Sequence, residues 1–481
     1  MKWRGRKKRA TEKAIADIWL PGHGAGHGAP RVIVIGAGFG GLAAVRELAR
    51  TGAEVMLIDR NVYSTFQPLL YQVATAGLNP GDVAYLVRAF THKLDVRFRL
   101  GGLTGIDPGR RQITLADGRR YEYDYLVLAT GVSAAYYGVT GAAEHTLGLY
   151  TRRDAITLRD HIVARLERLG LAGHGKDVNF TVVGGGPTGV ELAGALAELR
   201  STALEPSFPE VEGSSVHIRL VEMAPSLLGP FDRRLRDYAY QQLMDRGVDV
   251  RLATTIKEVT PDHVHLADGT DLPSDVTVWA AGVAAPQQVR AWGLPEGRGG
   301  RIMVRHDLRV HGHDNIFAIG DIALVDDQPL PQLAQPAIQG GRHVARQICH
   351  LMAGEPTTSF SYHDKGIMAT IGRRSAVVQL PYGVRIRGTI AWLAWLALHL
   401  ITLLGNRNRL SALLNLSFRY VSWGHGGGII VGDEPVPGNG GPCPPSATKL
   451  AGGAQAHEPA GAETQERQAA ERAEADASRR R

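Results

Sequence analysis

One pattern occurs twice in this chain of 481 residues: an apolar strand, a glycine-rich turn and a helix rich in Ala, Leu and Glu. The first copy starts at Arg31 and reads RVIVIGAGFGGLAAVRELARTGAEVMLIDR. The second starts at Asp177 and reads DVNFTVVGGGPTGVELAGALAEL, followed by HIRLVEMAP. A repeat at this scale indicates two copies of one supersecondary unit. Because each strand is apolar throughout and leads into a helix, the pattern predicts parallel sheets covered by helices, in the α/β class.

The spacing of the glycines predicts that both copies bind dinucleotides. Gly36 permits a tight turn, Gly38 lets backbone N–H groups approach a pyrophosphate, and Gly41 allows close packing of helix on strand. An acid that ends the next strand, Asp59 in the first copy and Glu222 in the second, can accept hydrogen bonds from ribose hydroxyls. A carboxylate in the second site would repel the 2′-phosphate of NADPH, so NADH is the expected donor.

Two dinucleotide sites on one chain imply that electrons pass between two bound cofactors. Short apolar runs that end in small residues follow the loops: DYLVLATGV, VTVWAAGV and NIFAIGDIA. This arrangement resembles the two-dinucleotide flavoproteins, in which a late Gly-Asp pair lies against the ribityl–phosphate part of FAD. The resemblance assigns FAD to the first loop and the nicotinamide to the second. It implies two Rossmann-like units, with FAD bound by Gly36, Gly38, Phe39, Gly40, Gly41, Asp59, Arg60, Ala129, Thr130, Gly131, Gly320 and Asp321, and NADH by Gly184, Gly186, Thr188, Gly189, Glu222 and Gly282.

Cysteine usage and charge exclude several classes of protein. With only Cys349 and Cys443, neither a disulfide framework nor a Cys/His metal site is possible, and no metal is expected. The basic start, MKWRGRKKRATEK, lacks the apolar core of a secretory signal. Such an arm binds anionic lipid or nucleic acid, or is simply solvated. Beside two nucleotide loops, we expect no nucleic-acid partner.

The chain resembles the type II NADH dehydrogenases, which are single-subunit NADH:quinone oxidoreductases, from about residue 30 to residue 430. The resemblance is carried by GAGFGGL, FQPLLYQVATAGL (66–78), GGGPTGVELAGALAEL (184–199), FAIGDIA and AQPAIQ (334–339). The last of these is similar to the quinone-site signature of the family. The resemblance implies that hydride passes from NADH to FAD, and two electrons from FAD to a membrane quinone, without proton pumping.

Three residues are candidates for catalysis: Glu191, Gln335 and Gln339. Gln335 and Gln339 are four apart, so on a helix they share a face, and neutral amides can hydrogen-bond a quinone carbonyl without burying a charge. Two exposed glutamines at a helix start are the alternative. Glu191 is expected in the first turn of its helix, where the helix dipole stabilises a carboxylate. The resemblance places it near flavin and quinone, where it steers the nicotinamide or relays a proton.

Other flavoproteins share this architecture. Disulfide reductases and sulfide:quinone oxidoreductases need paired cysteines near the flavin, and here FQPLLYQVATAG contains none. An NADH-sensing flavoprotein that binds a partner remains an alternative, and failure of the purified protein to reduce a soluble quinone with NADH would favour it.

The apolar stretch WLAWLALHLITLL (392–404) decides how the chain meets a membrane. A helix from Thr389 to Leu404 would span about 24 Å, which is short for a hydrocarbon core of about 30 Å. The following segment is amphipathic as a helix, with one apolar face made of Leu410, Leu413, Leu414, Phe418 and Val421. We therefore expect residues 388–430 to lie on the membrane surface, at the cytoplasmic face of the cell membrane. A single span, a buried core and a dimer contact remain alternatives, and a homodimer is plausible.

These features divide the chain into five parts. We expect a leader (1–29), an FAD-binding domain (30–150 and 300–350), an NADH-binding domain (151–299), C-terminal strands and amphipathic membrane-anchoring helices (351–432), and a tail of low complexity (433–481).

Overall fold

The computed structural model describes residues 28–172, 176–326 and 330–421. The expected tail, and all but the last two residues of the expected leader, lie outside the described residues. So does Trp423, which the amphipathic segment was expected to include.

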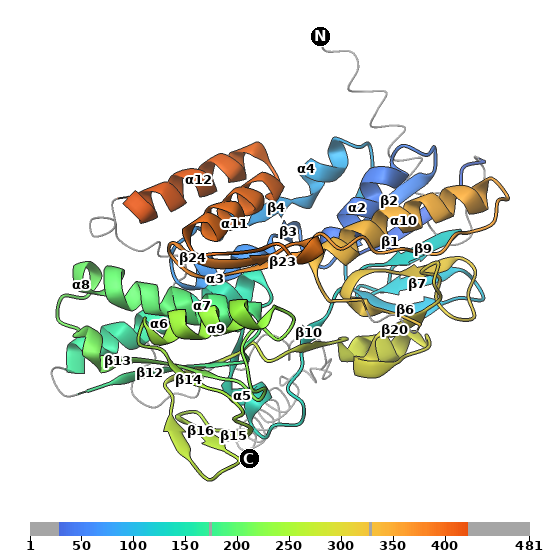
Figure 1. Ribbon diagram of the computed structural model, residues 1–481. Helices are drawn as coiled ribbons and strands as arrows, with labels where there is room; N and C mark the ends of the chain where they lie inside the picture. Colours follow the sequence, from blue (N-terminus) through green and yellow to red (C-terminus); the bar gives the residue numbers. More distant parts are fainter. Residues whose placement is uncertain (1–27, 173–175, 327–329, 422–481) are drawn as a thin grey trace, which may run out of the picture. The chain divides into compact units, whose positions relative to one another are not determined.

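The first repeat forms a five-stranded parallel sheet in the order β21-β9-β1-β2-β5. Its strands are β1 (Arg31–Ile35), β2 (Glu54–Asp59), β5 (Arg97–Leu100), β9 (Tyr125–Leu128) and β21 (Ile316–Ala318). The late strand β21 pairs with β9 although nearly 190 residues separate them, so the FAIGD segment returns to the first repeat. Helices α2 (Phe39–Leu48) and α10 (Ala334–Met352) pack closely against each other beside this sheet (Figure 1).

The second repeat forms another five-stranded parallel sheet, in the order β11-β18-β12-β13-β14. Its strands are β11 (Leu147–Gly148), β12 (Val178–Val183), β13 (Val216–Val221), β14 (Asp249–Arg251) and β18 (Val276–Trp279). The helices of this half are α6 (Arg152–Ala172), α7 (Pro187–Glu198), α8 (Leu204–Ser207) and α9 (Arg233–Met244). The α/β fold with two Rossmann-like units is thus confirmed.

Smaller elements connect the two sheets. Each repeat carries an antiparallel three-stranded sheet: β6 (Leu103–Asp107), β7 (Gln112–Leu115) and β8 (Arg120–Glu122) in the first, β15 (Ile256–Val259), β16 (His263–Leu266) and β17 (Asp271–Pro273) in the second. The remaining elements are β3 (Tyr63–Thr65), α3 (Leu70–Ala74), β4 (Ala84–Leu86), α4 (Val87–His92), α5 (Ala142–His145), β20 (Ile302–Val304) and β22 (Ala323–Val325).

The strand after ATG, β10 (Ser133–Ala134), pairs antiparallel with the strand after AAG, β19 (Val283–Ala284). Equivalent points of the two repeats therefore touch each other.

The C-terminal segment adds a third layer above α7. It contains the antiparallel sheet β23 (Ile367–Gly372), β24 (Ser375–Gln379) and β25 (Arg385–Arg387), then α11 (Thr389–Thr402) and α12 (Asn406–Val421), which lie side by side (Figure 1). Helix α7 approaches β23 so closely that a Cβ added at Gly194 would overlap the carbonyl oxygen of Ile371. Only glycine permits this distance between helix and strand.

Helix α11, which contains most of the apolar stretch, has one buried side and one exposed side. On α11, Ala391 and Trp395 are buried in the core, whereas Ile390, Leu393, Leu398 and Ile401 are 45–70% exposed. On α12, Leu410, Leu413, Leu414 and Phe418, predicted to share one apolar face, are 46–67% exposed. Among the described residues, no helix is both long enough and apolar enough to cross a membrane.

Replacing Gly194 by Ala should push α7 away from β23, because the added methyl group meets backbone that cannot rotate out of the way. We expect a loss of about 1–3 kcal/mol in the free energy of unfolding, typical of overpacking. Gly229→Ala is the matched control, because a Cβ at Gly229 has no atom within 4 Å. Thermal unfolding of both variants checks this, and equal midpoints would contradict it.

Candidate functional site

The two glycine loops have the same local geometry. Gly36 has φ 107° and Gly184 has φ 109°, backbone angles that side chains rarely allow. A Cβ at Gly41 would overlap the carbonyl oxygen of Gly36, and a Cβ at Gly189 would overlap that of Gly184. The predicted roles of these glycines in the turn and in helix–strand packing therefore have a steric basis in both copies.

The two acids at the strand ends also occupy equivalent positions. Asp59 accepts the N–H of Ala37 at 2.6 Å and that of Asn61 at 2.7 Å. Glu222 accepts the N–H of Gly185 and, at 2.6 Å, that of Ala224. Each carboxylate thus ties its own strand to the glycine loop, at the edge where a ribose would lie.

The loops fit the phosphates of dinucleotides. Gly38 and Gly186 are the N-caps of α2 and α7, and a Cβ at either would meet nothing within 4 Å. Open space therefore lies in front of two helix N-termini, whose free N–H groups favour anions. Phe39, Gly40 and Thr188 belong to the first turns of these helices, and Arg60 is exposed beside Asp59.

Polar side chains lie around the predicted Gly320-Asp321 turn. Gly320 has φ 71°, and its backbone lies against Ala337 of α10. Burial raises the pKa of Asp321 to about 6, while Arg301 and a hydrogen bond from Tyr150 lower it. The hydroxyl of Thr130, in the ATG motif, is buried and has no hydrogen-bond partner within the described residues. An unused buried donor beside the first loop is what a bound FAD would satisfy.

Glu191 is the most perturbed carboxyl group of the site. It lies in the second turn of α7, which corrects the expectation of a first-turn position, so stabilisation by the helix N-terminus does not explain it. The side chain is 9% exposed, and its Oε1 accepts the N–H of Thr370 in β23 at 3.2 Å. Burial raises the pKa of Glu191 to about 8, although the Thr370 N–H and the Trp395 side chain lower it. The group therefore carries a proton at neutral pH.

Aromatic side chains extend from the first glycine loop to the region of Glu191. Phe39 meets Phe66 edge-on at 5.8 Å, and Phe66 meets His399 at 6.1 Å. His399 stacks on Trp395 at 4.1 Å. Burial lowers the pKa of His399 to about 4, so its ring is neutral. Helix α11 thus contributes the buried ring of Trp395 and the half-buried ring of His399, which link the first glycine loop to the helix after the second.

The two predicted glutamines have different surroundings. Both lie in the first two turns of α10, as expected, and each is half-buried. Gln339 exchanges two hydrogen bonds with the backbone of His363, at 2.9 Å and 3.0 Å. Its amide therefore already holds the segment that leads to β23. Within the described residues, no hydrogen bond joins Glu191 to either glutamine.

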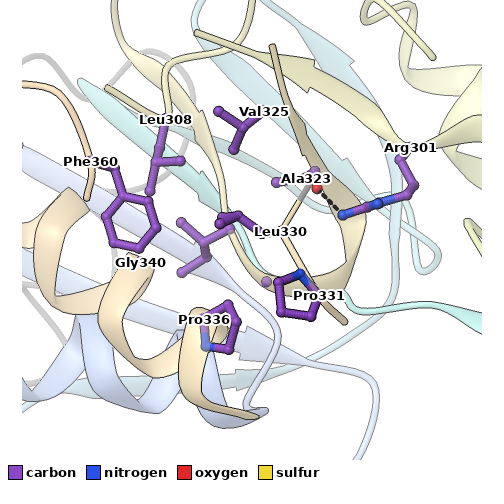
Figure 2. A pocket seen from close by; sticks show the side chains of 11 residues that line it. Arg301, Leu308, Ala323, Val325, Leu330, Pro331, Pro336, Gly340 and Phe360 are labelled. Atoms are coloured by element: carbon purple, nitrogen blue, oxygen red, sulfur yellow. Dashed lines mark hydrogen bonds between the residues drawn. The ribbon is translucent and has the colours of Figure 1, made fainter. Parts of the chain in front are cut away.

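A small cavity lies behind Gly320 and the start of α10. It measures about 10 Å³, room for roughly one water molecule. Figure 2 shows Pro336, Leu330 and Pro331 around it, with Arg301 donating to the carbonyl of Ala323. Packing here fixes the start of α10 against the Gly-Asp turn.

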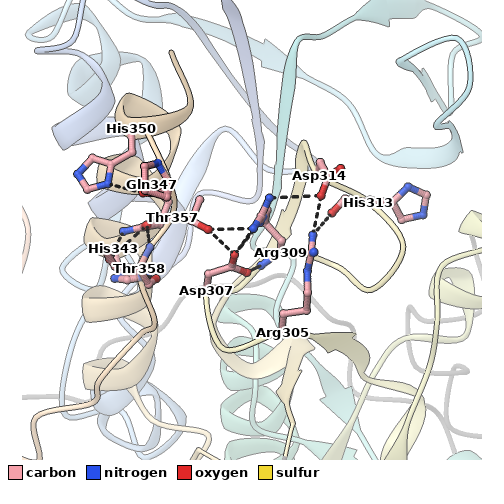
Figure 3. Close-up of polar contacts among 11 residues, drawn as sticks. Arg305, Asp307, Arg309, His313, Asp314, His343, Gln347, His350, Thr357 and Thr358 are labelled. Atoms are coloured by element: carbon pink, nitrogen blue, oxygen red, sulfur yellow. Dashed lines mark hydrogen bonds and ion pairs between the residues drawn. The ribbon is translucent and has the colours of Figure 1, made fainter. Parts of the chain in front are cut away.

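A polar cluster anchors the segment that follows α10. Gln347 of α10 accepts the N–H of Thr358 at 2.6 Å, and Thr357 donates to Asp307 at 2.8 Å (Figure 3). Arg309 also donates to Asp307, at 2.6 Å. Burial alone would raise the pKa of Asp307, but the bonds from Arg309 and Thr357 outweigh it and the pKa is lowered. The cluster holds the path from α10 to the strand that carries Thr370.

Comparison with known proteins identifies the family. The sequence matches the family described as pyridine nucleotide-disulphide oxidoreductase over residues 30–341. It is 36% identical over 411 residues to the type II NADH:quinone oxidoreductase Ndh of Mycobacterium tuberculosis, covering 82% of this chain and 88% of that one. The chain belongs to the type II NADH:quinone oxidoreductases.

Further relatives of the type II NADH:quinone oxidoreductase family agree with this. The Staphylococcus haemolyticus enzyme of that name is 31% identical and is matched over 91% of its length. Among solved structures, NDH2 from Plasmodium falciparum in complex with NADH has a TM-score of 0.75 at 18% identity, covering 82% of this chain and 98% of that one. The sulfide:quinone oxidoreductase of Aquifex aeolicus has a TM-score of 0.67 at 19% identity, which shows a shared fold only.

The sequence reasoning gave no site role to Tyr71, Trp395 and His399, whose rings pack together: that of Tyr71 lies 6.0 Å from Trp395, which stacks on His399. Tyr71 lies in the quoted FQPLLYQVATAGL segment, but no spacing rule assigns it a role. Trp395 and His399 belong to the apolar stretch, where they were interpreted as part of a lipid-facing helix. A histidine inside an otherwise apolar helix was the available signal, because its polar ring needs a reason to be there.

Glu191→Gln should change how the stability of this type II oxidoreductase depends on pH. An unfolded glutamate titrates near about 4.3, so between that value and about 8 the folded protein holds a proton that the unfolded chain releases. Wild-type stability is therefore lost as pH rises through this window. The variant should gain relative to wild type by on the order of 5 kcal/mol between low pH and pH 9. Unfolding midpoints between pH 5 and 9 measure this, with the exposed Glu205→Gln as control. A difference that is constant with pH would contradict the assignment.

Proposed function

We propose that this chain oxidises NADH with a bound FAD and passes two electrons to a quinone held in a membrane, without pumping protons. The observation that carries the proposal is the position of Glu191, a buried acid on α7, the helix after the second loop, that bonds Thr370 of β23 and Trp395 of α11. Aromatic rings connect this position to the first loop. The type II NADH:quinone oxidoreductases of Mycobacterium tuberculosis and Staphylococcus haemolyticus, to which the chain is similar, support the same activity.

The residues of this chain have separate tasks in that reaction. Backbone N–H groups at the N-termini of α2 and α7 bind the two pyrophosphates, and Asp59 and Glu222 bind the riboses, with Glu222 selecting NADH over NADPH. When bound, FAD supplies the chemistry of accepting a hydride and releasing electrons. The buried rings of Phe66 and Trp395, with the half-buried ring of His399, exclude water from the space between the loops.

Glu191 and Gln335 are assigned to the quinone. Reduction of a quinone to a quinol consumes two electrons and two protons, and Glu191 holds a proton at its carboxyl group at neutral pH. Gln335, which lies in the first turn of α10, offers a neutral amide to a quinone carbonyl. Gln339 holds the neighbouring segment through His363 instead of meeting the substrate directly.

Purified protein should be yellow, and NADH should bleach its flavin absorbance until a short-chain quinone restores it. Sulfide in place of NADH should leave the spectrum unchanged, since Cys349 is the free cysteine of the described residues and no disulfide is formed there. Protein that bleaches with NADH but ignores the quinone would favour a sensor. Protein that takes up no flavin would overturn the whole proposal.

We further propose that the outer faces of α11 and α12 bind an anionic lipid surface at the cytoplasmic face of the membrane. Eight apolar side chains of these helices are 45–70% exposed, and we call them the apolar face: Ile390, Leu393, Leu398, Ile401, Leu410, Leu413, Leu414 and Phe418. From Lys365 to Val421 the chain contains eight basic residues and no Asp or Glu. An apolar face within a purely cationic segment is suited to anionic headgroups above an apolar layer.

Replacing Leu413, Leu414 and Phe418 together by Ser should weaken binding to vesicles that contain anionic lipid by tenfold or more, about 1.4 kcal/mol at least, because apolar area is no longer buried. Leu171→Ser is the matched control, since Leu171 of α6 is 87% exposed outside this face. Co-sedimentation with vesicles measures the effect. Unchanged binding of the triple variant, or an equal loss in the control, would contradict the assignment of this surface.

A further inference from the structure

The segment between β9 and β11 contains a strained turn at residues 136–139. The N–H of Val139 donates to the carbonyl of Tyr136 at 3.0 Å, and both central residues have positive φ, 50° at Tyr137 and 76° at Gly138, as in a type I′ turn. Such turns favour Asn, Asp or Gly at the first central position, because these residues tolerate a left-handed backbone. A tyrosine is strained there, and strain of this kind is found most often at functional sites.

The backbone on both sides of this turn is held in place by hydrogen bonds. Before the turn, the N–H of Ala135 donates to the carbonyl of Gly282 at 3.0 Å, and the indole of Trp279 donates to the carbonyl of Ala135 at 2.7 Å. After the turn, the carbonyl of Thr140 accepts the N–H of Val259 at 2.9 Å. Movement at the turn is therefore confined to its side chains.

The side chain of Tyr137 lies against one defined part of the backbone. A Cβ added at Gly282 would overlap the hydroxyl of Tyr137 and crowd the edge of its ring. The ring therefore rests on Gly282, in the space that a side chain at this position would need. Because Tyr137 is 71% exposed, its ring can rotate away from Gly282 into solvent without disturbing the core.

Gly282 lies beside the second glycine loop. It ends the AAG segment (280–282), which directly follows β18. The N–H of Ala280 donates at 2.8 Å to the carbonyl of Val183, the last residue of β12. A Cβ added at Gly184, the first glycine of the loop, would overlap the carbonyl oxygen of Ala280. The AAG segment is therefore packed against the glycine loop at the carboxyl edge of the sheet.

The order of the strands decides which half of NADH meets the AAG segment. Strand β12 lies between β13 and β18, so the glycine loop that follows it has a neighbour on each side. Glu222 follows β13 and would take the ribose of the adenosine half, with the pyrophosphate at the N-terminus of α7. The nicotinamide half must then extend to the other side of the loop, over the AAG segment that follows β18.

We propose that the Tyr137 ring covers the nicotinamide end of the NADH site in the free protein, and that NADH binds by displacing this ring from Gly282. Tyr137 thereby lowers the affinity of the protein for the nicotinamide half of its substrate. The inference rests on the function proposed above, because it takes the second loop as the NADH site. It also gives a reason for the strained tyrosine, since this turn aims the ring at Gly282.

Calorimetric titration of the full-length, flavin-loaded protein tests this inference with two ligands. NAD⁺ contains the nicotinamide half and does not reduce the flavin, whereas ADP contains the adenosine half alone. A site that is open in about a third of the molecules binds its ligand about threefold more weakly than a site that is always open. In Tyr137→Ala, the Kd for NAD⁺ should therefore fall about threefold while the Kd for ADP stays unchanged. An unchanged or higher Kd for NAD⁺ would overturn the proposal.

Two further variants separate the effect of the ring from that of the turn. Tyr137→Phe keeps the ring and should keep the wild-type Kd for NAD⁺. Tyr137→Asn removes the ring and suits the left-handed backbone, so it should bind NAD⁺ as tightly as Tyr137→Ala and unfold at a higher temperature than wild type. Equal affinities of Tyr137→Phe and Tyr137→Ala for NAD⁺, or a lower unfolding midpoint for Tyr137→Asn, would contradict the proposal.

A fluorine label at position 137 reports the displacement directly. Fluorotyrosine incorporated there retains the side chain, and its fluorine NMR resonance should move when NAD⁺ is added and stay in place when ADP is added.

Tyr382→Ala is the matched control for the titrations. Tyr382 is also an exposed tyrosine with positive φ that precedes a glycine, but it lies in the loop between β24 and β25. Its replacement should leave the Kd for NAD⁺ unchanged. A fluorine resonance that does not respond to NAD⁺, or an equal change of Kd in this control, would overturn the proposal.

The titrations also separate this inference from the proposed function. If Tyr137→Ala binds NAD⁺ more tightly but NADH and quinone do not react, the displacement of the ring stands and the function fails. If the protein reduces quinone with NADH but Tyr137→Ala binds NAD⁺ as wild type does, the function stands and the inference fails.

Discussion

Burial of the Glu191 carboxyl group requires three distant parts of the sequence to meet. The acid belongs to the helix after the second glycine loop, its backbone donor is Thr370, and its indole donor is Trp395 of α11. Gly194 lets the helix and β23 come close enough for the bond to Thr370. The C-terminal segment is therefore an integral part of the site: without it, Glu191 would lose both donors and be exposed to water.

The duplicated units supply the frame around that acid. Both units have nearly the same φ angle at the first glycine of the loop, and in both a loop N–H donates to the acid at the end of the next strand. The same local structure for binding a dinucleotide therefore occurs twice. The pairing of β10 with β19 joins the units at equivalent points, Ser133 opposite Ala284 and Ala134 opposite Val283. Contact between equivalent strands orients the two loops with respect to each other, as transfer between two cofactors requires.

The parts predicted from sequence are those that local spacing determines. Short-range rules predict the glycine turns, the acids Asp59 and Glu222 and the strands around them. From the first glycine to the acid, these rules span about 25 residues in the first copy and about 40 in the second. The placement of Glu191 could not be predicted in the same way, because its partner Thr370 lies 179 residues away. Gln339 illustrates the same limit, since only the folded chain shows that its amide is taken by His363. The sequence did not decide whether the apolar stretch packs in the core or faces the surface, because both sides of α11 are apolar. One side is buried in the core and the other side is exposed.

The contact between Gly77 and Arg419 has a consequence for the history of the chain. The guanidinium occupies the space that any side chain at position 77 would need, although 342 positions separate the two residues. A bulkier residue at position 77 would displace the Arg419 guanidinium from its hydrogen bond to Gln72. Descendants of this sequence should therefore change the two sites as a covarying pair.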